Sequence, residues 1–147
     1  MAQGSFSAQV SSWVRETKAR QTAVYKESAQ RVIERMQTPR GAGGNMRVDT
    51  GFLRASLVAT TSGALPPTVP KPDGDAKHSW DAAQVSLVIA GADIKDPITA
   101  VYTANYARHR EYGANGQAPD RFVALAAQQW QRIVNEVCEE AKSRAGG

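Results

Sequence analysis

The chain has 147 residues, which is enough for one domain, with or without an extended arm. Its content of 41% hydrophobic and 22% charged residues is typical of a globular protein, and no apolar run approaches the ~20 residues of a membrane span. The net charge of +4 is compatible with nucleic acid or an acidic protein partner, but the basic residues are scattered in short tracts.

Residues 5–37 show the pattern of one long amphipathic helix. Apolar side chains recur there at steps of three and four residues, first at Phe6, Val10, Trp13, Val14 and Thr17 and again from Val24 to Met36. A helix of roughly 30 residues is about 45 Å long, which exceeds the diameter of a small core. Part of it must therefore project or pack on a second chain. Thr38-Pro39 ends it, and the glycine-rich residues 41–45 follow as a flexible connector.

The stretch Asp49-Thr50-Gly51 is predicted to form a capped turn. Asp49 is a natural N-cap, whose carboxylate would accept from the backbone N–H of Gly51 or Phe52. Leu53 is expected in the core, and Arg54 is expected to form an ion pair with Asp49 or Glu111.

Strands are predicted at residues 57–61, 84–90 and 98–102, which gives an antiparallel sheet of about three to four strands. Residues 63–82 form an extended arm or loop, because four prolines between positions 66 and 72 exclude a helix or an interior strand. Trp80, near the end of this arm, is expected to anchor it on the core or on a neighbouring subunit.

Two helical segments complete the chain. Residues 106–113 are predicted to form a short helix with Gly113 as its C-cap. Asp120 is predicted to cap a final amphipathic helix that runs without interruption to about residue 143 and carries Cys138 as a small buried side chain. The order of elements predicts one α+β domain over residues 1–147, with the long helix within 1–38.

Asp-Thr-Gly is also the signature of aspartic proteases, but its context here argues against that chemistry. The residue after Gly51 is the bulky Phe52, whereas a protease needs a small residue where two such loops meet. Retroviral-type proteases are almost wholly β, whereas this chain begins and ends in helices. The run Arg108-His109-Arg110-Glu111 contains groups suited to acid/base chemistry, but charges on an exposed helical turn more often form a solvated face or an interface. We predict no catalytic, metal or cofactor site.

Three motifs occur in a familiar order: Val48-Asp49-Thr50-Gly51-Phe52-Leu53-Arg54-Ala55-Ser56, then Tyr106-Ala107 with Glu111-Tyr112-Gly113, then Ala118-Pro119-Asp120-Arg121-Phe122. Together with the long first helix, they resemble the neck or tail-completion family of minor virion proteins of long-tailed bacteriophages, which includes the lambda tail-completion protein. The resemblance covers most of the chain. In the family, Thr-Pro usually runs almost directly into Val-Asp-Thr-Gly, whereas residues 40–47 intervene here.

The resemblance implies a non-enzymatic virion protein that forms a ring, commonly a hexamer, at the head–tail junction and makes the tail competent to join a DNA-filled head. Its implied partners are copies of itself, a tail terminator or tube protein, head-closure or connector proteins and DNA in the lumen, with no membrane. Assembly would take place in the host cytoplasm. A tail terminator, a head-closure protein and a small nucleic-acid-binding module remain alternatives. The residues expected at interfaces or in structural turns are Asp49, Gly51, Leu53, Arg54, Trp80, Arg108, Arg110, Glu111, Tyr112 and Gly113, with the arm at 65–75 as a further contact.

Overall fold

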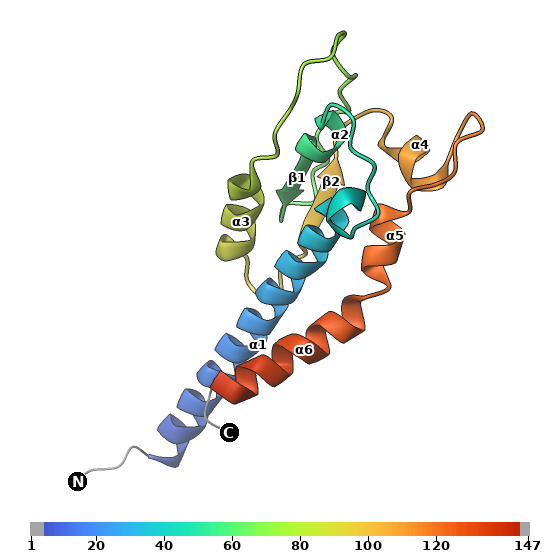
Figure 1. Ribbon diagram of the computed structural model, residues 1–147. Helices are drawn as coiled ribbons and strands as arrows, with labels where there is room; N and C mark the ends of the chain where they lie inside the picture. The colour runs from blue at the N-terminus through green and yellow to red at the C-terminus, as the bar shows by residue number, and fades with distance from the viewer. Residues whose placement is uncertain (1–4, 145–147) are drawn as a thin grey trace.

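The computed structural model describes residues 5–144 and combines helices with a small antiparallel sheet, so the α+β class is confirmed in its broad form (Figure 1). The long helix α1 (Phe6–Gln37) has 32 residues, as the apolar periodicity predicted. Ser5 caps it, because its hydroxyl accepts from the Ala8 N–H at 3.2 Å. The helix ends before Thr38, whose extended backbone is the conformation that the following proline favours.

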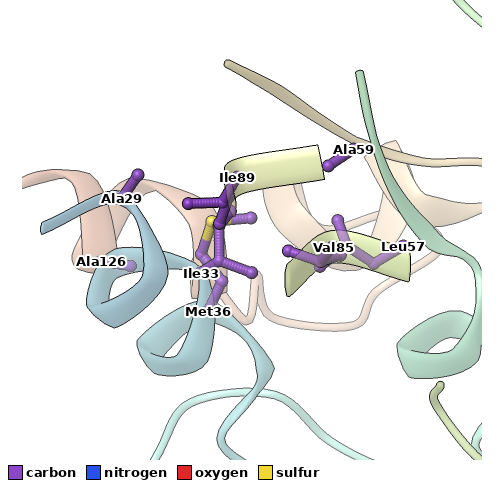
Figure 2. Packing of buried hydrophobic residues seen from close by; sticks show 8 residues of the cluster. All are labelled: Ala29, Ile33, Met36, Leu57, Ala59, Val85, Ile89 and Ala126. Atoms are coloured by element: carbon purple, nitrogen blue, oxygen red, sulfur yellow. The ribbon is translucent and has the colours of Figure 1, made fainter. Parts of the chain in front are cut away.

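The main core forms on the C-terminal half of α1. Ala29, Ile33 and Met36 are buried there, and Figure 2 shows them facing Leu57, Ala59, Val85, Ile89 and Ala126. These partners come from β1 (Leu57–Thr60), α3 (Ala82–Gly91) and α5 (Phe122–Ala127). A second cluster joins Met46, Leu53, Ala104 and Phe122 beyond the end of α1. The core therefore occupies one end of the molecule and leaves the first turns of α1 outside it.

The sheet within residues 5–144 has two strands, β1 and β2 (Thr99–Tyr102), paired antiparallel with Leu57 opposite Tyr102. The predicted strand at 84–90 is wrong, because these residues belong to the helix α3. A short apolar run does not distinguish a buried strand from a buried helix by periodicity alone. Here the deciding signal is Asp81, whose carboxylate accepts from the Ala83 N–H at 3.0 Å and caps the helix.

Gln84 of α3 occupies the place of a further strand at the free edge of β1. Its Oε1 accepts from the Ala59 N–H at 2.9 Å, and its Nε2 donates to the Ala59 carbonyl oxygen, also at 2.9 Å. One side-chain amide thus satisfies the two backbone groups that an adjacent strand would have paired. The same contact blocks this point of an otherwise open sheet edge.

We expect Gln84→Ala to lower the free energy of unfolding by about 2 kcal/mol, because a partly buried N–H and C=O both lose their partner. Urea-induced unfolding measures the change. The conservative variant Gln84→Glu keeps an acceptor for the Ala59 N–H but loses the donor, so it should also be destabilised. Gln131→Ala, on an exposed face of the last helix, serves as the control. A Gln84→Ala variant as stable as that control would contradict the edge-pairing role.

The proline-rich arm is extended and largely exposed, but its backbone is attached to the body at two points. The Val69 N–H donates to the Thr103 carbonyl oxygen at 2.7 Å, and the Asn105 N–H donates to the Val69 carbonyl oxygen at 2.9 Å. Further along, the His78 N–H donates to the Thr50 carbonyl oxygen at 2.8 Å. Trp80 then packs against the main core, so it anchors the arm on its own subunit.

The connector after α1 is folded, which corrects its prediction as a flexible segment. It contains the 3-10 turn η1 (Arg40–Ala42), and the Arg40 N–H donates to the Met46 carbonyl oxygen at 3.0 Å. Met46 is fully buried at its end. The loop therefore delivers a core side chain, a role that its glycine-rich composition did not reveal.

The remaining helices are α2 (Phe52–Ala55), α4 (Ala107–Tyr112) and α6 (Trp130–Arg144). The predicted short helix with Gly113 as its C-cap is confirmed as α4. The predicted final helix is instead two helices, because the chain turns at residues 128–129 between α5 and α6. This turn lets α5 pack on the core while α6 lies along α1 (Figure 1). Within residues 5–144, none of the helices has the length and apolarity needed to cross a membrane.

Candidate interaction surfaces

The three sequence motifs meet at the end of the molecule beyond α1, because each of them contributes apolar side chains to the second core cluster. We call this region the motif junction and define it by Arg47, Gly51, Glu111, Gly113 and Asp120. The Asp120 carboxylate is fully buried and accepts from Arg47 twice, from its Nε at 2.5 Å and from its backbone N–H at 3.2 Å. Arg40 approaches the same carboxylate at 3.4 Å. Asp120 therefore joins the third motif to the segment just before the first.

Asp120 was predicted to be the N-cap of the last helix, and this prediction is wrong. The N-cap position of α5 is Arg121, which has a left-handed backbone with φ of 54° and no side-chain cap bond. The cap comes from Glu111 of α4, whose carboxylate oxygens accept from the Val123 and Ala124 N–H groups, each at 2.9 Å. Glu111 is buried, and its negative charge pairs with N–H groups that the first turn of a helix leaves without an intrahelical acceptor.

The two glycines of the junction allow close approaches of the backbone. Gly51 has φ of 84°, and a Cβ there would lie 2.4 Å from the His78 carbonyl oxygen of the arm. Gly113 also has φ of 84°, and its Cβ would lie 2.8 Å from the Gln117 carbonyl oxygen. Both positions thus combine a backbone conformation that side chains disfavour with a lack of space. Backbone geometry therefore explains the glycine of the Asp-Thr-Gly motif and that of the Glu-Tyr-Gly motif.

Asp49 does not cap α2, contrary to the sequence prediction. The cap residue is Gly51, and the hydroxyl nearest the helix start is that of Thr50, 3.4 Å from the Phe52 N–H. Asp49 is exposed, and its backbone carbonyl oxygen accepts from Lys77 Nζ at 3.1 Å. The sequence does not distinguish Asp49 from Thr50, because both residue types commonly bond to nearby backbone N–H groups at turns. The backbone turn places the Thr50 hydroxyl nearer to the start of α2.

Arg54 was expected to pair with Asp49 or Glu111, but its bonds in the described chain go elsewhere. Its Nε donates to the Gln37 carbonyl oxygen at 2.8 Å, and its guanidinium lies 5.6 Å from the centre of the Trp80 ring. The Gln37 side chain is buried and returns a bond to the Arg54 carbonyl oxygen at 2.8 Å. Together with Leu53 in the second core cluster, Arg54 therefore fixes α2 against the end of α1.

Tyr102 of β2 extends this polar network into the core. Its hydroxyl donates to Gln37 Oε1 at 2.6 Å, and burial together with the negative charge of Glu111 raises the pKa of Tyr102 above its ordinary value. The phenol therefore stays protonated and acts as a fixed hydrogen-bond donor.

Of the predicted interface residues of α4, Arg108 and Tyr112 are exposed and Arg110 is partly exposed, whereas Glu111 is buried. The Arg108 guanidinium stands 5.8 Å from the centre of the Tyr112 ring, which is 70% exposed. Arg110 borders a small recess of about 220 Å³ together with Arg47, Asp49 and Lys71. The recess carries net positive charge and suits a carboxylate better than a cation. Among residues 5–144, no group of three or more His, Cys, Asp and Glu side chains is arranged to hold a metal ion.

The first turns of α1 carry an uncovered apolar face, which we call the N-terminal stripe: Phe6, Val10, Trp13 and Val14. Phe6 is 82% exposed and Trp13 is 65% exposed. Figure 1 shows these turns extending past the end of α6, away from the core. Monomeric proteins rarely expose two large aromatic side chains on one helix face. Exposed apolar patches of this kind mark interaction sites.

Further along α1, an apolar groove of about 360 Å³ opens between this helix and α6. The α1/α6 groove is lined by Arg20, Gln21, Val24, Tyr25, Ser28, Trp130, Val134 and Cys138. Cys138 is only partly buried, which corrects the prediction that it is a core residue. Ser28 is fully buried on the α1 side, and its hydroxyl has no hydrogen-bond partner within the described chain. The groove thus combines apolar walls with one unsatisfied polar atom.

The sequence identified the stripe by its periodicity but did not show the groove or the junction pairs. The groove requires α6 to lie beside α1, and a turn at residues 128–129 with no glycine or proline sets that position. The Arg47–Asp120 pair joins segments separated by more than 70 residues, so no local spacing indicates it.

Comparisons of the chain with protein-family models, with curated proteins and with solved structures found no match.

Proposed function

We propose that this chain is a non-enzymatic structural protein of a tailed bacteriophage that forms a ring at the head–tail junction. In this role it completes the tail and enables the tail to join the DNA-filled head. The ordered motifs of the sequence are the basis for the family resemblance, and hexameric rings are what that resemblance implies. The proposed partners are copies of this chain, a tail tube or terminator protein and a head-side connector.

The observation that carries the proposal is the uncovered N-terminal stripe on a helix that outruns its own core. A 32-residue helix is about 48 Å long, yet its buried residues begin only at Ser28. The stripe therefore lacks a partner within the described chain, and a partner subunit would remove its aromatic side chains from water. A protein with this distribution of apolar surface is better suited to assembly with other subunits than to function as a monomer.

The motif junction supports a structural role for the same residues. The contacts of this junction hold the arm, α4 and α5 to the rest of the subunit. They are the ion pair of Asp120, the helix cap from Glu111 and the close backbone approaches at the two glycines. The resemblance in sequence thus falls on residues that set the shape of the subunit. Asp49, in contrast, is exposed and shares its recess with four cationic residues, unlike a protease aspartate that shares its proton with a second carboxylate.

The proposal is tested by locating the protein in phage particles. A short epitope tag at the C-terminus of the chain, expressed during infection, should appear by gold labelling at the head-proximal end of the tail. Omitting the protein should leave heads and tails unjoined. Label distributed over the head shell, or absent from purified particles with normal joining, would contradict the proposed function. Steeply salt-dependent binding of the free protein to duplex DNA would favour the nucleic-acid-binding alternative.

A further inference from the structure

We infer that the N-terminal stripe of one copy of this chain docks into the α1/α6 groove of the next copy. The occupant of the groove is thus the first turns of α1 from a second subunit, with Phe6, Val10 and Trp13 as the inserted side chains. The inference deepens the proposed ring function and rests on it for the head-to-tail sense of the contact. It names the surface through which neighbouring subunits would recognise each other.

The chemistry of the two surfaces is matched. Residues 5–14, Ser-Phe-Ser-Ala-Gln-Val-Ser-Ser-Trp-Val, contain no charged side chain, so their burial removes no ion from water. The groove is mostly apolar, with Val24, Trp130 and Val134 among its walls and a single cationic residue, Arg20, in its lining. The groove therefore selects an uncharged amphipathic helix of the kind that this chain itself presents.

The positions of the two surfaces make the contact head-to-tail. The stripe and the α1 wall of the groove lie at different positions along the axis of α1. Ten residues, or about 15 Å, separate Val10 of the stripe from Arg20 of the groove. A projecting surface and a receiving surface at different places on one molecule form a heterologous contact, which closes into a ring when the rotation between copies allows it. Each subunit then inserts its own helix tip and receives that of a neighbour.

The area involved predicts weak pairs and stable rings. An aromatic side chain buries 150–250 Å², so the exposed parts of Phe6 and Trp13 amount to roughly 300 Å². A stable two-protein interface buries about 800 Å² on each partner. One stripe in one groove is therefore marginal for an isolated pair, whereas a closed ring doubles the contacts of each subunit and removes the open ends.

Cys138 provides a direct test, because this sole cysteine lies in the groove. A second cysteine introduced as Val10→Cys is too far along α1 for an internal disulfide, which needs Cα atoms within about 7 Å. Under mild oxidation we expect Val10→Cys to give covalent dimers, trimers and larger species up to the closed ring. Ser11→Cys, one residue away on another face of the helix, is the matched control and should stay at the background level.

The outcomes separate the possible arrangements. Cross-links that persist after Cys138→Ala is added to Val10→Cys would show Val10 meeting Val10 in a symmetric pair, and would overturn the inference. Equal cross-linking of Val10→Cys and Ser11→Cys would overturn it as well. If the ring assembles on phage tails without any Val10–Cys138 cross-link, the proposed function stands and this contact is wrong. If the cross-link forms but the protein never enters a particle, the contact stands and the proposed function is wrong.

Loss of the inserted side chain gives a second, independent measurement. Trp13→Ser should weaken self-association by roughly 30-fold, as expected for an interface tryptophan, while the unfolding transition stays unchanged because the side chain is exposed. Leu87→Ser removes an equally exposed apolar side chain from α3 and is the control. Equal self-association of the Trp13→Ser and Leu87→Ser variants would overturn the inference.

Discussion

Replacing Asp120 by alanine is expected to lower the free energy of unfolding by about 3 kcal/mol, a large share of the 5–15 kcal/mol that stabilises a typical domain. The carboxylate is fully buried and is the acceptor for the Arg47 backbone N–H, the Arg47 side chain and Arg40. Its removal leaves a partly buried guanidinium and a backbone donor without their partner. Both arginines retain some contact with solvent, which keeps the loss below the upper end of the range for buried pairs.

Denaturant unfolding of a small series tests this role of Asp120. Asp120→Asn keeps an acceptor for the backbone N–H but loses the charge, so its destabilisation should be about half as large. Asp73→Ala, in the exposed part of the arm, is the matched control and should stay within about 0.5 kcal/mol of the unaltered protein. In a double-mutant cycle, Arg47→Ala and Asp120→Ala should couple by at least 1 kcal/mol. Additive effects in that cycle would mean that the pair does not stabilise the junction.

Glu111→Ala is expected to destabilise the protein by about 3 kcal/mol through a different route. The variant leaves the Val123 and Ala124 N–H groups at the start of α5 without an acceptor, and hydrogen bonds to a charged group are worth about 1.5–3 kcal/mol each. The helix α5 has only 6 residues and brings Phe122 and Ala126 into the core, so its loosening affects both core clusters. Unfolding in urea measures the loss, and hydrogen exchange at the two amides shows where it arises.

The Glu111 series needs a control of equal charge. Glu136→Ala removes an exposed carboxylate from α6, where its bond to Arg132 is a surface ion pair worth less than 1 kcal/mol. Glu111→Gln keeps one acceptor for the two donors and should fall between the unaltered protein and Glu111→Ala. If amide exchange at positions 123 and 124 is unchanged in Glu111→Ala, Glu111 does not cap α5.

The sequence predicted best the elements that depend on local signals. The apolar periodicity of residues 6–37 is long enough to define a helix without tertiary information, and Thr38-Pro39 marks its end. The strands at 57–60 and 99–102 and the glycine cap after α4 also follow from nearby residues. Such elements are recoverable because the physical cause lies within a few positions of the effect.

Several of the errors arose because a partner distant in sequence, or a cap that apolar periodicity does not reveal, decided the outcome. Asp120 has the composition of a helix cap, but Arg47 claims its carboxylate and Glu111 supplies the cap instead. Residues 84–90 have the composition of a strand, but Asp81 starts a helix and Gln84 substitutes for the strand at the sheet edge. For the candidate interaction surfaces, periodicity identified the stripe on α1, whereas the groove arises only when α6 folds beside it.

The most direct test of an assembling subunit is its mass in solution, alone and mixed with purified tail tubes, with particle images of the mixture. The single chain has a mass of 15.8 kDa. We predict a closed oligomer of several copies that sediments with the tubes and appears as a ring at one end of each tube. A protein that remains at the mass of one chain at every concentration, both alone and beside the tubes, would contradict the proposal that α1 is completed by neighbouring subunits.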